Sequence, residues 1–267
     1  MNYAIQSNQA EFDLPNQTLT NKTHRMSISG PTSNFTALKS LFLSVVATVR
    51  KESPSLYWIV VAHFVFTIIC IPAFIIDDRT LLGVNVWLKP LKFLISTGIY
   101  IFTFGYFTTL YQFSSRKKKI LNNLVAWTLL VETIIIVVQG GRGIQSHYNI
   151  HSAIDGMLFA AMGILIAVNV LIMIFYLIET IRVKMNTSKS IQWSIFLGWI
   201  ILIAGSWVGG QMISQMSHNV EVVDGGAGLP LVNWSTIAGD LRIAHFFGIH
   251  GMQIIPLFAF WISKKWK

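Results

Sequence analysis

Six apolar segments, each close to the ~20 residues that a helix needs to cross a bilayer, constrain this chain more than any other feature. They cover residues 55–76, 88–113, 120–139, 153–179, 192–214 and 241–263. Backbone N–H and C=O groups inside hydrocarbon must be hydrogen-bonded within the protein, and a helix satisfies nearly all of its own. The sequence therefore predicts an all-α integral membrane protein, built as a bundle of six transmembrane helices.

The low content of charged residues supports this interpretation. Only 12% of the 267 residues are charged, against about 25% in a typical soluble domain, and 53% are apolar. Such a chain has too few polar side chains to cover a water-facing surface, which argues against a soluble enzyme. Its single cysteine, Cys70, excludes an intrachain disulfide, an iron–sulfur cluster and a cysteine-rich zinc site.

The chain before the first apolar segment divides into two parts. Residues 1–34 are polar and lack apolar periodicity, which is typical of a disordered tail. Residues 35–52 carry apolar side chains at helical spacing, at Leu38, Leu41, Phe42, Val45, Val46 and Val49. We expect a short amphipathic helix at the membrane interface, although packing on other protein would give the same pattern. Residues 53–267 then form the six-helix transmembrane domain.

The distribution of basic residues predicts the orientation of the bundle. The chain has 20 Lys and Arg against 11 Asp and Glu, a net charge of +9. If the N-terminus is cytoplasmic, fifteen basic residues lie on the inner side and five on the outer side: Arg79, Lys89, Lys92, Arg142 and Arg242. The positive-inside rule therefore predicts a multi-pass protein of the plasma membrane with both termini in the cytoplasm. The basic run at 116–119 fits a cytoplasmic turn, so we expect no nucleic-acid partner.

Polar and ionisable residues gather toward the outer end of the predicted bundle. An ionised side chain at the centre of a bilayer costs about 2.5–3.5 kcal/mol on insertion scales, so each one needs a structural or functional reason. Histidines, arginines and aspartates concentrate in the outer connectors, and Gln139, Asp240 and Gln253 extend the polar lining. This asymmetry predicts a site that a small-molecule substrate or an electron acceptor reaches from the extracytoplasmic side.

A divalent metal is one candidate occupant of this site. His147, His151 and Asp155 are spaced i, i+4 and i+8, which on a helix would place them on one face. Two histidines four residues apart can share a metal ion, and His245 or Asp240 from the last segment would complete its ligand set. The alternative is that these histidines cap helices and hydrogen-bond lipid headgroups.

A b-type haem is the second candidate cofactor. His63 on the first segment and His250 on the last lie at similar predicted depth, so they would serve as the axial ligands. Arg142 and Arg242 would then hold the propionates. The alternative for His63 is a hydrogen bond between two helices.

Glu132 stands in the middle of the third segment. An intramembrane carboxyl is a candidate for proton transfer or cation coordination, or it stays protonated and hydrogen-bonds across a helix interface. Two sets of small residues predict close helix packing: the pair Gly205 and Gly209, and a row at Gly156, Ala160, Gly163 and Ala167.

The leading functional hypothesis is a protein that binds a metal or haem for redox or small-molecule chemistry. One alternative is a proton-coupled transporter, in which Lys92, Arg142 and Arg242 attract a small anion and Glu132, His63 and His250 relay protons. A metal-dependent intramembrane hydrolase and a purely structural subunit are further alternatives, so the sequence leaves enzymatic activity open.

Overall fold

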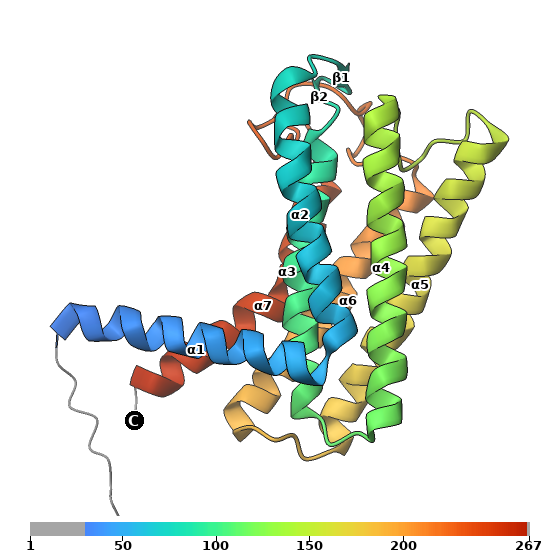
Figure 1. Cartoon of the computed structure of the whole chain (residues 1–267). Coiled ribbons are helices and arrows are strands. Elements are labelled where there is room, and N and C mark those ends of the chain that lie inside the picture. The colour runs from blue at the N-terminus through green and yellow to red at the C-terminus, as the bar shows by residue number, and fades with distance from the viewer. Residues whose placement is uncertain (1–29, 266–267) are drawn as a thin grey trace, which may run out of the picture. The chain divides into compact units, whose positions relative to one another are not determined.

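The computed structural model describes residues 30–265 and is almost entirely helical (Figure 1). Its elements are α1 (Gly30–Glu52), α2 (Pro54–Ile76), β1 (Thr80–Leu81), β2 (Val84–Asn85), α3 (Leu88–Phe107), the 3-10 turn η1 (Thr108–Leu110), α4 (Ser115–Arg142), α5 (Ala153–Arg182), α6 (Lys189–Ser214) and α7 (Leu241–Lys265). Six helices among the described residues, α2 to α7, are long and apolar enough to cross a membrane. The predicted six-helix membrane protein is confirmed at this level.

The outward surface of these helices is apolar. Ile75 is 70% exposed, Leu171 67% and Trp207 66%, each on a different helix. Soluble monomers rarely expose continuous apolar surface of this extent. Lipid chains are the environment that such side chains fit.

The N-terminal region is only partly described. Within the described residues, the chain divides into two units between Leu41 and Phe42, and α1 contains that boundary. The expected polar tail, residues 1–34, lies outside the described residues except for 30–34, which begin α1. The predicted amphipathic segment, residues 35–52, is helical throughout.

Serine side chains define where three of the helices begin. Ser114, Ser152 and Ser188 each accept a hydrogen bond from the backbone N–H three residues later, at the starts of α4, α5 and α6. An N-cap of this kind typically stabilises a helix by about 1 kcal/mol. At the other end of α4, Gly143 adopts a left-handed φ of 72°, which glycine tolerates and which ends the helix.

A small antiparallel hairpin of β1 and β2 forms the connection between α2 and α3. Its two turn residues, Leu82 and Gly83, both have positive φ, as a two-residue hairpin turn requires. Arg79 ties the hairpin to its surroundings by donating to Asp77 Oδ2 at 2.7 Å and to the carbonyl of Gly141 at 2.9 Å. The hydrogen bonds from Arg79 and from the Trp87 indole lower the pKa of Asp77.

Helices α6 and α7 make the closest helix–helix contact. A Cβ placed on Gly205 would lie 2.7 Å from Gly248 Cα, so only glycine fits there. Gly209 packs on the His245 ring at the same interface. The prediction for this pair is therefore confirmed. The prediction for the second row is wrong, because a Cβ at Gly156 or Gly163 would meet no atom within 4 Å.

We name the two ends of the bundle by their connectors: the loop end carries residues 77–87, 143–152 and 215–240, and the basic end carries 111–114 and 183–188. Toward the basic end, four buried aromatic residues form a layer: Phe104, Tyr111, Tyr176 and Trp199. The Trp199 indole donates to Tyr111 Oη at 3.1 Å, and its ring stacks on Tyr176 with centroids 5.6 Å apart. The polar groups discussed next lie toward the opposite end.

Candidate functional site

Cationic and histidine side chains from four elements meet at the loop end. We call this set the cationic cluster: Lys89 and Lys92 from the start of α3, His147 from the 143–152 loop, His218 from the 215–240 loop, and Arg242 from the start of α7. The two long loops fold over the first turns of α3. Lys92 Nζ donates to the carbonyl of Val232 at 3.2 Å, and the rings of Tyr148 and His218 lie 5.1 Å apart.

Lys89 contacts His147 directly. Its ammonium donates to His147 Nδ1 at 3.2 Å, which fixes a neutral imidazole with its proton on Nε2. The Phe93 and Phe159 rings flank the imidazole. Burial, and then the charge of Lys89, keep the pKa of His147 well below 6.5. His147 thus acts as an acceptor for a cation and adds no charge of its own.

Asp224 is fully engaged by its own loop. Its carboxylate contacts His218 Nδ1 at 2.5 Å and accepts from the backbone N–H groups of His218 and Asn219 at 3.1 and 3.0 Å and from the hydroxyl of Ser217 at 3.0 Å. Burial raises the pKa of Asp224, but the nearby His218 and these donors together hold it below its usual value. Burial lowers the pKa of His218 to about 4, against the opposing effect of Asp224.

Asp240 is equally occupied. Arg242 binds it through two nitrogens, Nε to Oδ1 at 2.9 Å and Nη2 to Oδ2 at 2.6 Å. The backbone N–H groups of Ser235 and Arg242 also donate to this carboxylate, whose side chain is fully buried. This bidentate, hydrogen-bonded pair neutralises most of the charge of Arg242.

The remaining charge in the cluster is unbalanced. Neither Lys89 nor Lys92 forms an ion pair with any residue in 30–265, and the two ammonium groups repel each other. Arg242 adds to the repulsion on both lysines, whereas Glu132 and Asp224 attract Lys89 and Asp240 attracts Lys92 without touching them. The direct contacts of Asp224 and Asp240 are made by other donors. Partly buried ammonium groups with no carboxylate in direct contact are unfavourable, and a bound anion would offset that cost.

Glu132 lies deeper in the bundle, on α4. Its side chain is only 6% exposed and forms no hydrogen bond or ion pair with the described residues. Its electrostatic partner is Lys89. Glu132 therefore continues the cluster inward as a buried carboxyl.

Arg142, Gln139 and Asp155 form a separate network. Arg142 Nη1 donates to Asp155 Oδ1 at 2.8 Å and to Gln139 Oε1 at 2.6 Å, and Gln139 Nε2 donates to the same carboxylate oxygen at 3.0 Å. The Ser152 hydroxyl donates to Asp155 Oδ2 at 2.7 Å. Among residues 35–263, no hydrogen bond or ion pair joins this network to the cationic cluster, and the network ties the end of α4 to the start of α5.

The structure does not assemble the predicted metal ligands. His147 and His151 lie in a loop, because α5 begins only at Ala153, so the single helical face expected for His147, His151 and Asp155 is wrong. Asp155 bonds within its own network, and His245 Nδ1 contacts the carbonyl of Gly205 at 2.8 Å. Within the described range, no three metal-binding side chains come together.

The two predicted haem ligands already have protein partners. His63 contacts the carbonyl of Ile59 through Nδ1 at 2.8 Å and Thr133 Oγ1 through Nε2 at 3.2 Å. His250 contacts the carbonyl of Phe246 at 2.7 Å and Ser96 Oγ at 3.1 Å. The side-chain amide of Gln253 faces the carbonyl of His250, and in the orientation that satisfies both groups its nitrogen donates to that carbonyl at 2.9 Å. For His63, the contact with α4 matches the alternative of a helix–helix hydrogen bond.

The sequence hypotheses gave no site role to Lys89, His218 or Asp224. Lys89 stands three residues before Lys92, so the two share one helix face, and that spacing is a signal available from sequence. His218 and Asp224 carry no such signal because their contact depends on the conformation of the 215–240 loop. Of the predicted anion-binding residues, Lys92 and Arg242 lie in the cluster and Arg142 belongs to the network with Asp155.

Comparison of this chain with models of protein families, with curated proteins and with solved structures finds no match.

Proposed function

We propose that this membrane protein binds a small anion at the cationic cluster on its loop end. The observation that carries the proposal is the unbalanced charge of Lys89 and Lys92 beside two carboxylates that are saturated by other donors. Two ammonium groups, together with the N–H donors of Arg242 and the histidines, offer the chemistry that carboxylate, phosphate or sulfate oxygens require.

The orientation of the protein is part of the proposal. The excess of basic residues at the opposite end favours cytoplasmic termini in a plasma membrane, so the anion would arrive from the extracytoplasmic side. The interfacial placement of α1 is supported by its exposed apolar side chains: Phe35 is 72% exposed and Leu38 63%.

Anion-dependent thermal stabilisation tests the binding step. Purified full-length protein in detergent is titrated with sulfate, phosphate or acetate at constant ionic strength, with chloride as the reference. Saturation at 100 times the dissociation constant stabilises the folded state by about 2.7 kcal/mol. We expect at least one anion to raise the unfolding temperature.

Two variants and a control make this assay specific. Lys89→Gln and Lys92→Gln should each abolish most of the shift, whereas Lys184→Gln removes the same charge from the basic end and should leave it unchanged. A stabilisation that survives in both lysine variants, or that vanishes equally in Lys184→Gln, contradicts the proposed site.

Proton-coupled transport of the anion is a second candidate, favoured by the position of Glu132. Its carboxyl is buried, has no hydrogen-bond partner among the described residues and interacts with Lys89, which links a proton site to the anion site. In proteoliposomes, Glu132→Gln should then abolish pH-driven uptake but keep the anion-induced stabilisation. Uptake that is unchanged by Glu132→Gln refutes the proton role.

The metal and haem hypotheses lead to a separate measurement. An absorption spectrum and metal analysis of the purified protein test both together. A Soret band that is lost in His63→Ala and in His250→Ala would support the haem, and stoichiometric metal lost in His147→Ala would support the metal. A featureless spectrum without bound metal rejects both, and with them the hydrolase hypothesis.

A further inference from the structure

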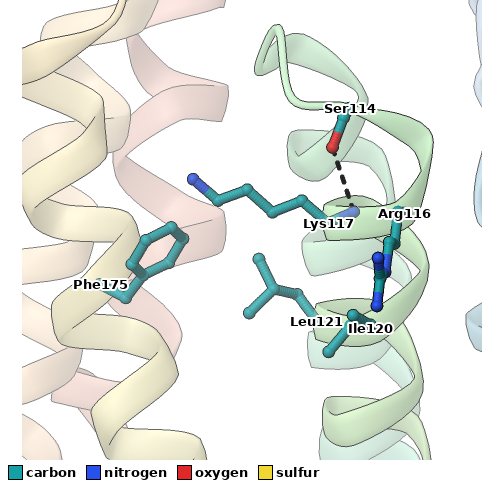
Figure 2. A pocket seen from close by; sticks show the side chains of 6 residues that line it. All are labelled: Ser114, Arg116, Lys117, Ile120, Leu121 and Phe175. Atoms are coloured by element: carbon teal, nitrogen blue, oxygen red, sulfur yellow. Dashed lines mark hydrogen bonds between the residues drawn. The ribbon is translucent and has the colours of Figure 1, made fainter.

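A groove opens at the basic end, between the first turns of α4 and the last turns of α5 (Figure 2). Its volume is about 310 Å³, and it is lined by Ser114, Arg116, Lys117, Ile120, Leu121 and Phe175. Figure 2 shows Lys117 reaching from α4 toward the Phe175 ring, with Leu121 beside it. The groove thus has an apolar floor and a cationic rim.

Lys117 is held in place and largely neutralised. Its ammonium lies 3.6 Å from Glu179 Oε2 and 4.0 and 4.5 Å from the ring centroids of Phe113 and Phe175. Arg116 differs, because it is exposed and forms no ion pair with any residue in 30–265. Lys118 and Lys119 follow it on the same turn, also without ion pairs in that range. Of these residues only Arg116 and Lys117 line the groove, so the uncompensated positive charge of the rim is that of Arg116.

We propose that this groove binds an anionic phospholipid. The phosphate would lie against the Arg116 guanidinium, which can bind phosphate through two parallel N–H groups. The acyl chain would follow Ile120 and Leu121 along α4. The charge of the rim is complementary to an anionic headgroup, and the groove lies where the α4 span begins, at Ser115. Free phosphate would use the rim but gain nothing from the apolar floor.

Native mass spectrometry of the full-length protein in mild detergent tests this proposal. The probes are phosphatidylglycerol and phosphatidylcholine with identical acyl chains. One basic residue near an anionic membrane surface contributes about a factor of five to binding. We expect phosphatidylglycerol to be retained preferentially, and Arg116→Gln to weaken that retention about fivefold.

Two further variants separate the groove from general surface charge. Ile120→Trp changes no charge but fills the groove, so it should also lower phosphatidylglycerol retention. Lys184→Gln removes a charge from the other basic connector and should have no effect. Four results would each overturn the proposal. The two lipids are retained equally, or Arg116→Gln and Lys184→Gln lose phosphatidylglycerol to the same extent. Alternatively, Ile120→Trp retains it fully, or inorganic phosphate displaces it.

Discussion

The contact between α6 and α7 gives the sharpest test of the fold. In Gly205→Ala, the new methyl group would lie 2.7 Å from Gly248 Cα and 2.8 Å from both Gly248 C and Ile249 N. All three atoms belong to the backbone of α7, so no side-chain rotation can relieve the overlap. The two helices must move apart along this interface.

The expected cost follows from two opposing effects. Alanine is intrinsically better than glycine inside a helix by about 1 kcal/mol. Overpacking typically costs about 1–3 kcal/mol, and here the strain lies on backbone atoms, which favours the upper part of that range. We therefore expect Gly205→Ala to destabilise the protein by about 1–2 kcal/mol. The movement would also disturb the contact of His245 with the carbonyl of Gly205, next to the cationic cluster.

Gly163→Ala is the matched control, because it makes the same chemical change in the interior of another transmembrane helix. A Cβ there meets nothing within 4 Å, so only the gain in helix propensity applies. Unfolding by sodium dodecyl sulfate in mixed micelles, followed by near-ultraviolet circular dichroism, measures both variants against the parent protein. If Gly205→Ala proves as stable as Gly163→Ala, the α6–α7 contact described here is wrong.

Two further perturbations address the loop end. Asp155→Ala should lower the stability of the protein by about 1–2 kcal/mol, because it removes the ion-pair partner of half-exposed Arg142. Asp155→Asn should cost less, because the amide still accepts hydrogen bonds. Equal losses of stability in the two variants, measured by mixed-micelle unfolding, would contradict the role of the charge. Stability should fall as the pH drops below about 6.5, because His147 and His218 take up protons when unfolded but not when folded, and each contributes a slope of at most ~1.4 kcal/mol per pH unit. His147→Gln should remove the share of one histidine from that dependence between pH 7 and pH 5, and an unchanged slope in thermal unfolding would contradict the depressed pKa of His147.

The transmembrane segments were predictable because they depend on a local property. Twenty apolar residues in a row leave helix formation as the main way to satisfy the backbone in lipid, and the segment predicted at 241–263 coincides with the span Leu241–Ser263. The start of α5 was harder to place. Ser152 caps that helix, so His147 and His151 lie in the loop before it, although their spacing of four residues resembles that of a helix.

The polar site was only partly predictable because it is built from non-local contacts. Lys92 and Arg242 stood out as cations at segment ends, but the pairing of Lys89 with His147 joins residues 58 positions apart. The sequence singled out Asp240 as a polar or metal-binding residue and gave Asp224 no role. Only the fold shows that other donors contact both carboxylates, so neither carboxylate forms an ion pair with a lysine of the cluster.

The aromatic layer of Phe104, Tyr111, Tyr176 and Trp199 sets a condition on any movement of solute through the bundle. These four side chains are at most 1% exposed, and a hydrogen bond joins Trp199 to Tyr111 within the layer. A solute that only binds at the cationic cluster and leaves again does not disturb this aromatic layer. A solute that crosses here must displace these side chains, and comparison with Trp199→Phe identifies the part of the emission of the nine tryptophans that comes from Trp199.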